Sequence, residues 1–248
     1  MKVPEGFKSG WGLQIHDPSV FSRSQWDGGH QASLTYLVFR LLLAGYFIAT
    51  EIYFIYYITP SFFFIYLTDL AYTLLVIDAC LHAYNAYKME PKQRAVYQVT
   101  WVFMSIAYSV GILVTIFYWI FLFGEESEFP LGFDIQMHVL NSLYIVVSAA
   151  TMAAPIQLKH MYQPVLFMFL YAVFSIIYWV AGGVDEHGSP YIYPFLYWLH
   201  FGTALKYSAI ATVGMILAHL IVWGICKLRC RIAHSVIGRI YRVHSVIV

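Results

Sequence analysis

Thr68 and His138 are the two side chains of this sequence whose types fit covalent chemistry as a pair. A threonine hydroxyl becomes a nucleophile when a base removes its proton, and a neutral imidazole is well suited to be that base. Each lies in a long apolar stretch, where a polar group without a partner is costly. Two alternatives stay open: Thr68 could bond back to its own helix, and Ser142, one turn from His138, is a competing hydroxyl. The pair marks a candidate site for nucleophilic catalysis.

Charged side chains within the same apolar stretches predict two ion pairs. At a rise of about 1.5 Å per residue, Arg40 and Asp78 come out about 10 and 15 Å from one membrane face. Glu51 and Lys206 come out about 10 and 8 Å from the other face. Because an unpaired charge at these depths is expensive, we expect Arg40 to pair with Asp78. For the same reason we expect Glu51 to pair with Lys206. His82, one turn after Asp78, completes what we expect to be a structural clasp between helices.

The same depth calculation puts Thr68 and His138 in one layer, about 9 and 8 Å from the outer face. At about 100° per residue, Thr68 shares an arc of its helix with Asp78, whereas Asp69 lies roughly opposite. His82 beside Asp78 is more typical of a satisfied helix histidine than of a metal ligand, and no other pair has metal-ligand spacing. We therefore predict neither a metal nor a cofactor.

The composition of the chain indicates which elements must position these side chains. Hydrophobic residues make up 60% of the 248 residues and charged residues only 11%, against about 25% in soluble domains. The apolar runs reach the roughly 20 residues that a helix needs to cross a bilayer. We therefore predict an all-α, polytopic membrane protein with a bundle of six transmembrane helices. Its partners are expected to be membrane lipids rather than nucleic acid.

The predicted spans are separated by proline, glycine and charged segments. Their approximate bounds are 33–58, 62–88, 98–123, 133–154, 164–182 and 201–226. The chain then divides into an N-terminal segment (1–32), a six-helix transmembrane domain (33–226) and a basic tail (227–248).

Basic residues set the predicted orientation. All 14 Lys and Arg residues except Arg40 and Lys206 fall in segments that six spans place on one side. The loops on the other side carry acidic residues and no Lys or Arg. The positive-inside rule then puts both termini in the cytoplasm. Cys226 and Cys230, at the inner end of the last span, lie where reversible palmitoylation occurs.

Short motifs in several spans and in one loop carry a family resemblance. They are Gly182–Asp185 with Gly188 and Tyr191–Pro194, Tyr66–Thr68, His138 with Asn141, Phe174–Tyr178, and Arg40. Together they resemble the rolling stone family of insect and invertebrate multipass membrane proteins, over roughly residues 34–232. That family is distantly similar to the androgen-induced and androgen-dependent TFPI-regulating membrane proteins. Those proteins hydrolyse fatty acid esters of hydroxy fatty acids with a catalytic Thr and His.

The resemblance implies two functions of different classes. The hydrolase motifs fall on Thr68 and His138, which implies a lipid ester hydrolase acting on fatty-acyl esters in the plasma membrane or an endomembrane. Polar residues expected to support this site are Asp69, Asn141, Glu51, Lys206 and Tyr193. Lys206 or Tyr193 would stabilise the oxyanion, and Asp69 would strengthen His138 as a base or pair with Lys206. The rolling stone resemblance instead implies a non-enzymatic role in myoblast fusion or cell–cell interaction, through the aromatic loop 182–198.

Overall fold

The computed structural model describes residues 12–15, 17–27, 32–57, 60–88, 93–122 and 131–246, and in the last helix the side chains as far as residue 236. Residues 1–11 of the predicted N-terminal segment and the acidic loop 123–130, both used in the orientation prediction, lie outside these ranges. Within the described residues the chain forms helices and no β-strand, with one isolated bridge between Ser24 and Met152.

The described chain makes six helical passes, some of them interrupted. The α-helices are α1 (Leu34–Tyr57), α2 (Pro60–Phe63), α3 (Leu67–Lys88), α4 (Arg94–Phe117), α5 (Leu131–Asp134), α6 (Leu140–Thr151), α7 (Tyr162–Val180) and α8 (Phe201–Val246). The shorter elements are the 3-10 helices η2 (Pro18–Phe21), η5 (Leu158–Met161), η6 (Pro194–Leu196) and η7 (Trp198–His200) and the π-helical turns η3 (Tyr118–Leu122) and η4 (Ile135–Val139).

Contacts between segments far apart in sequence define the two ends of the bundle. At one end, Phe21 stacks on Tyr97 at the start of α4, and Arg229 of α8 donates to the carbonyl oxygen of Ala149 near the end of α6. We call this the inner end, because the basic residues predict it to face the cytoplasm. At the outer end, Phe54 near the end of α1 packs edge-on against Phe133 of α5.

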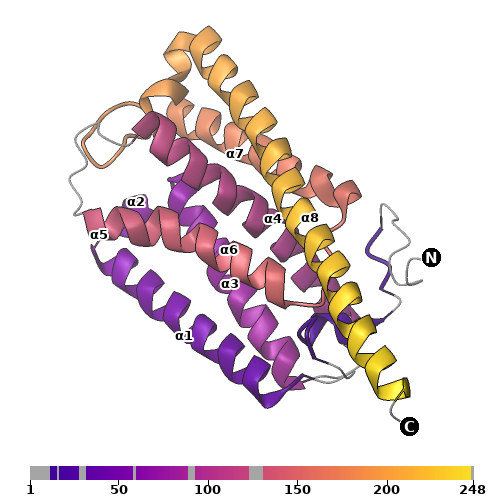
Figure 1. The fold of residues 1–248 in the computed structure, drawn as a ribbon. Helices are drawn as coiled ribbons and strands as arrows, with labels where there is room; N and C mark the ends of the chain where they lie inside the picture. The colour runs from indigo at the N-terminus through magenta and orange to yellow at the C-terminus, as the bar shows by residue number, and fades with distance from the viewer. Residues whose placement is uncertain are drawn as a thin grey trace.

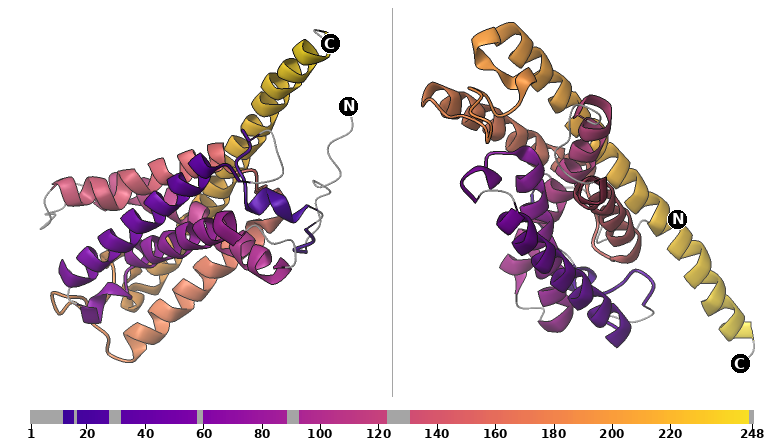
Figure 2. Two further views of the ribbon diagram at one scale, coloured as in Figure 1. Left: turned by 90° about the horizontal axis from the view of Figure 1, so that it is seen from below. Right: turned by 90° about the vertical axis from the view of Figure 1, so that its left-hand side faces the viewer.

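The helix α4 forms the centre of the bundle, packed against α3, α6, α7 and α8, while α1 packs on α3. Figure 1 shows α8 running along the whole bundle, and Figure 2 shows it extending past the other helices. Two glycines allow close approach to α4: a Cβ on Gly111 would lie 2.6 Å from Ile145, and one on Gly214 would lie 2.7 Å from Leu113.

In the part of the chain that the structure describes, four helical segments are long and apolar enough to cross a membrane: Leu34–Tyr57, Arg94–Leu122, Leu158–Val180 and Trp198–Val236. The other two passes differ in character. The helix α3 carries Asp69, Asp78 and His82, which lower its hydropathy, and the fourth pass is divided by a π-helical turn. Six spans and cytoplasmic termini therefore remain predictions.

The structure corrects three of the predicted helix bounds. The second pass is not continuous from residue 62, because α2 ends at Phe63 and α3 begins at Leu67. The fifth pass already begins at Leu158. The last helix extends beyond the predicted boundary at Cys226: α8 continues to Val246, since no proline follows Pro194 in the sequence. Its 46 residues correspond to about 69 Å, more than twice the hydrocarbon thickness.

Candidate functional site

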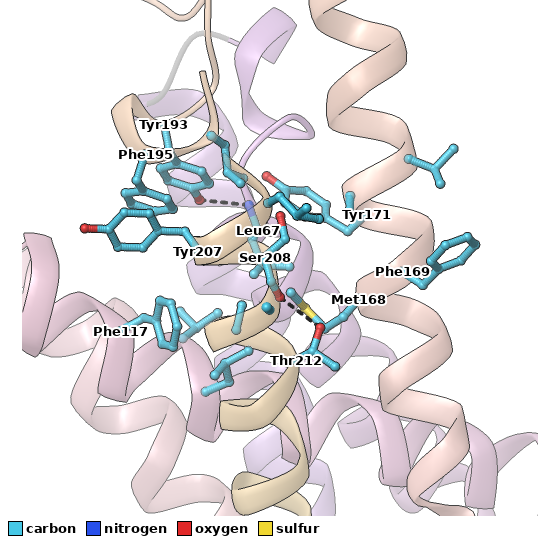
Figure 3. A pocket seen from close by; sticks show the side chains of 18 of the residues that line it. Leu67, Phe117, Met168, Phe169, Tyr171, Tyr193, Phe195, Tyr207, Ser208 and Thr212 are labelled. Atoms are coloured by element: carbon cyan, nitrogen blue, oxygen red, sulfur yellow. Dashed lines mark hydrogen bonds between the residues drawn. The ribbon is translucent and has the colours of Figure 1, made fainter. Parts of the chain in front are cut away.

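An apolar cavity lies at the outer half of the bundle between the start of α3, α4, α7 and α8 (Figure 3). Its volume is about 520 Å³, within the range of small-ligand sites. Most of its walls are apolar side chains such as Phe117, Met168 and Phe195. The polar groups among its lining residues include Thr68 and Tyr193. The cavity can therefore hold an apolar chain with a polar group at one side.

Thr68 lies in the first turn of α3, where the helix leaves its first amides without partners inside the helix. The helix is interrupted just before this turn, and two tyrosines from other elements form hydrogen bonds with the backbone groups at the interruption. The amide of Leu67 donates to the hydroxyl oxygen of Tyr193 at 3.0 Å (Figure 3), and the Tyr171 hydroxyl donates to the carbonyl oxygen of Ile65 at 2.9 Å. These bonds hold the start of α3, and with it Thr68, against the cavity.

Tyr193 belongs to the segment between α7 and α8, just before η6. Burial, and after it the nearby carboxylate of Asp69, raise the pKa of its hydroxyl to about 12. The phenol therefore keeps its proton at physiological pH and has a hydrogen to donate. This agrees with the proposed donor role of Tyr193, because its oxygen accepts from Leu67 while its proton stays available to a second group.

His138 lies in the π-helical turn η4, and its side chain is only 5% exposed. The wider turn changes the backbone pairing: Thr115 of α4 donates its hydroxyl to the His138 carbonyl oxygen at 2.6 Å. The imidazole stacks flat on the ring of Tyr118, with ring centroids 3.6 Å apart and planes at 7°. Tyr118 opens the second π-helical turn, η3. The stacked rings thus connect the two π-helical turns. Such turns are rare in proteins as a whole, and those that occur are often at functional sites.

The structure connects Thr68 and His138 indirectly. Thr68 and Tyr118 both line the cavity, and the Tyr118 ring covers the imidazole of His138. Among the hydrogen bonds between described side chains, none joins Thr68 to His138, and the Nδ1 atom of His138 is buried without a partner. The competing hydroxyl, Ser142, donates to Thr115 instead, at 2.9 Å.

Two of the expected supporting residues are buried near these groups. Asp69, next to Thr68, is 3% exposed and forms no ion pair with the exposed Lys206. Asn141, one turn after Met137, donates its side-chain amide to the Met137 carbonyl oxygen, while its own Oδ1 atom is buried without a partner. Of the two roles left open for Asp69, the pair with Lys206 is therefore not formed.

The predicted pair of Glu51 and Lys206 is also not formed. Glu51 is half-buried, and its Oε1 atom has no hydrogen-bond partner. Lys206 is exposed, with its Nζ atom 5.8 Å from the centre of the Tyr207 ring. The reason is helix packing, because α1 packs on α3 whereas α8 packs on α4, α6 and α7. Equal depth in the bilayer does not bring two helices together.

Arg40, Asp78 and His82 belong to one buried polar cluster, as the predicted clasp requires. Arg40 and Asp78 form no direct ion pair within it. Arg40 and Asp78 are both fully buried, and each is bonded to a hydroxyl of α6 rather than to the other. Arg40 donates to Ser148 at 2.9 Å, and Tyr144, one turn earlier on α6, donates to Asp78 at 2.8 Å. His82 lies with its Nε2 atom 3.5 Å from Asp78, as the spacing predicts. Hydroxyls of α6 therefore join α1 to α3, so the direct Arg40–Asp78 pair is a wrong prediction.

The fold and the cavity define a polytopic α-helical membrane protein with an internal apolar site. The family model for protein rolling stone matches residues 81–248 of the chain. The chain is 24% identical over 265 aligned residues to protein rolling stone of Drosophila melanogaster, covering 96% of this chain and 93% of that protein. It belongs to the rolling stone family. No solved structure matches the chain.

Three residues of the site were missed by sequence reasoning: Thr115, Tyr118 and Tyr171. A tyrosine in an apolar stretch of a chain with 21 tyrosines gives no positional signal. The π-helical turns are equally invisible in a hydropathy pattern. Thr115, one turn after Gly111 on α4, is the one residue of the three that has a sequence signal, since a buried hydroxyl needs a partner.

Proposed function

We propose that this protein is an intramembrane lipid ester hydrolase, with Thr68 as its nucleophile and His138 as its general base. One observation carries the proposal: the Thr68 side chain lies in the wall of an apolar cavity of about 520 Å³, at the first turn of a helix. The fatty-acyl chain of the substrate would lie among the apolar side chains of that cavity. The substrate class comes from the sequence motifs around Thr68 and His138, which resemble those of membrane fatty-acyl ester hydrolases.

The proposed reaction has two steps. The Thr68 Oγ1 atom attacks the ester carbonyl carbon while its proton passes to His138, and the tetrahedral intermediate then expels the alcohol, which takes the proton from His138. Water next attacks the acyl-threonine with His138 as base, and the fatty acid leaves as Thr68 regains its proton. The protonated hydroxyl of Tyr193 would stabilise the oxyanion. Lys206, being exposed and directed to Tyr207, is not assigned this role.

Proton transfer requires His138 to reach Thr68, and the Tyr118 ring stands at the cavity side of the imidazole. Either a water bridges the two residues or the Tyr118 ring turns aside when substrate enters. Catalytic hydrogen bonds are often long in proteins without substrate and shorten in the complex. The π-helical turns at His138 and Tyr118 are places where such an adjustment needs little rearrangement of regular helix.

Labelling with a fluorophosphonate that carries an alkyl chain tests the nucleophile. The purified wild-type chain is expected to gain one adduct, Thr68→Ala is expected to gain none, and Thr68→Ser is expected to keep the adduct because it retains the hydroxyl. The half-buried Thr73, on the same helix, provides a matched control through Thr73→Ala. Equal labelling of the wild type and Thr68→Ala, or labelling of neither, would show that Thr68 is not the nucleophile.

A second candidate is the non-enzymatic role in cell fusion or cell–cell interaction. It is favoured by the defined shape of the loop after α7, where Asp185 accepts from the amides of His187 and Ser189 at 3.0 and 2.7 Å. Gly188 takes a positive φ of 81° in this turn. A fixed outer loop is suited to contact a partner. Full activity of Thr68→Ala in a cell-fusion assay would favour this role over hydrolysis.

A further inference from the structure

A second cavity, of about 220 Å³, lies at the inner end of the bundle between residues 155–159 and α8. Three cationic side chains line it: Lys159 from η5, and Lys227 and Arg229 from α8. Trp223 stands beside them, with the Lys227 Nζ atom 5.7 Å from its ring centre. None of the described residues that line this cavity is acidic. It is separate from the Thr68 site, which lies at the opposite end of α8.

Arg229 is the buried member of this basic group, with only 3% of its surface exposed. Its Nη1 atom donates to the carbonyl oxygens of Ala149 and Met152, and its Nη2 atom donates to that of Ala154 at 3.3 Å. These oxygens lie at and beyond the end of α6, where a helix presents carbonyls without partners. The Nε atom has no hydrogen-bond partner. The guanidinium is thus hydrogen-bonded by neutral groups and still carries its full charge.

The C-terminal half of the chain offers this charge no counter-ion. Residues 135–248 contain two carboxylic side chains, Asp185 and Glu186, and both lie in the loop at the outer end. Among the described residues, no Asp or Glu forms an ion pair with Arg229, and the ion pairs that do occur involve histidines. A buried charge without an opposite charge is expensive. The buried charge of Arg229, together with Lys227 on the same small cavity, therefore indicates an anionic ligand.

The position of the cavity indicates where that anion comes from. The apolar helix of the fifth pass begins at Leu158, and the predicted inner boundary of the last span is Cys226. The cavity thus lies at the level of lipid headgroups, where tryptophans such as Trp223 are enriched. Leu158 and Leu228, adjacent to it, are 38% and 57% exposed. An acyl chain could lie along these side chains while its headgroup enters the cavity.

We propose that this basic cavity binds the phosphate of an anionic membrane lipid. Arg229, already fixed by the α6 carbonyls, supplies a preorganised charge, while Lys159 and Lys227 close on the phosphate from the two sides of the cavity. Basic pockets between helices on the cytoplasmic side are a known means of headgroup recognition. Because the bound phosphate would join α8 to the segment after α6, it would also stabilise the packing of the last helix. The site is independent of any hydrolysis at Thr68.

Binding to the purified full chain in detergent tests this assignment, with short-chain phosphatidic acid, short-chain phosphatidylcholine and inorganic phosphate as probes and native mass spectrometry as the readout. The wild type is expected to bind phosphatidic acid about tenfold more tightly than either other probe. The double variant Lys159→Gln/Lys227→Gln should lose that preference. These two lysines are chosen because Arg229 also holds three carbonyls, so its removal could unfold the end of α6.

Arg231→Gln is the matched control, since Arg231 is exposed on α8 and does not line the cavity. It should bind phosphatidic acid like the wild type. An equal loss in Arg231→Gln would mean that the overall positive charge, not the cavity, attracts the lipid. An unchanged preference in the double variant would show that the cavity is not the binding site. Inorganic phosphate bound as tightly as phosphatidic acid would overturn the assignment to a lipid. Thr68→Ala should leave this binding unchanged.

Discussion

Thr68 and the groups around it show how much of this site depends on single hydroxyls. The hydroxyl of Tyr193 accepts from the amide of Leu67, and that of Tyr171 donates to the carbonyl of Ile65. Both bonds end at backbone groups that the break between α2 and α3 leaves free. Unpaired backbone groups at this depth would be costly. The site residue Thr68 is therefore held in place by side chains of α7 and the outer loop.

Removing the Tyr193 hydroxyl should destabilise the fold measurably. In Tyr193→Phe the buried amide of Leu67 loses its acceptor, so the free energy of unfolding should fall by about 1 to 3 kcal/mol. Denaturant unfolding of the purified chain in detergent measures this change. Tyr191→Phe, in the same loop, removes a hydroxyl for which the structure shows no hydrogen bond and should change stability by less than about 0.5 kcal/mol. Equal effects of the two substitutions would contradict the structural role of Tyr193.

The positions of the helices followed from the sequence more readily than their contacts did. Apolar runs and breakers located the long helical segments, because hydropathy and proline act locally. The contacts of Glu51 and Asp78 could not be derived in the same way. Depth and angle assume straight helices with 3.6 residues per turn, whereas η4 widens the turn at His138. They also say nothing about which helices are neighbours, and Asp78 takes its hydrogen bond from Tyr144 of α6 rather than from Arg40.

The helix α6 should act as the link between the two buried charges. Tyr144→Phe removes the hydroxyl that donates to Asp78, and Ser148→Ala removes the acceptor of the Arg40 Nη1 atom, so each should cost about 1 to 3 kcal/mol of stability. Because both serve one buried cluster, a double-mutant cycle should give a coupling energy above about 0.5 kcal/mol. Unfolding free energies of the four proteins supply this value. Additive losses would mean that the two charges are independent.

Filling the outer cavity should block the acyl chain without touching Thr68. Ala172 of α7 lines the cavity, and Ala172→Phe places a ring where the chain would lie. Excluding two methylene groups removes about 1.6 kcal/mol of binding energy, so labelling of Thr68 by a long-chain fluorophosphonate should slow about tenfold. A short-chain fluorophosphonate should label the variant at nearly the wild-type rate. Ala49→Phe on the exposed face of α1 is the control and should label normally with both. If the long-chain probe labelled Ala172→Phe at the wild-type rate, the acyl chain would not lie beside Ala172 in this cavity.

At the scale of the whole molecule, the chain has basic groups at its inner end and acidic groups in its outer loop. The N-terminal segment packs on the ends of α4 and α6, where the Gln25 amide donates to the carbonyl oxygen of Thr151 at 2.8 Å. The Asp185 loop lies at the other end, beside Tyr193 and the outer cavity. The cavity lined by Thr68 thus lies at one end of the bundle, and the basic cavity lined by Arg229 lies at the other.

The predicted orientation can be checked by engineered glycosylation. His187→Asn creates the sequence Asn-Gly-Ser in the outer loop, and Val243→Asn creates Asn-His-Ser in the tail. Expressed in animal cells, the first variant is expected to be glycosylated and the second is not, because glycosylation occurs on the side away from the cytoplasm. A shift in gel mobility that glycosidase reverses is the readout. Glycosylation of the tail variant alone would show that the orientation is the opposite of the predicted one.

Hydrolysis of a fatty-acyl ester by the purified chain tests the central claim most directly, through the acyl-threonine that the reaction must form. Incubation with a long-chain ester followed by rapid acid quenching and peptide mass spectrometry should locate the acyl group on Thr68. His138→Gln should lower the rate of its formation about a hundredfold or more, as removal of a general base does. An acyl group on another residue, or ester turnover that persists in Thr68→Ala, would contradict the account.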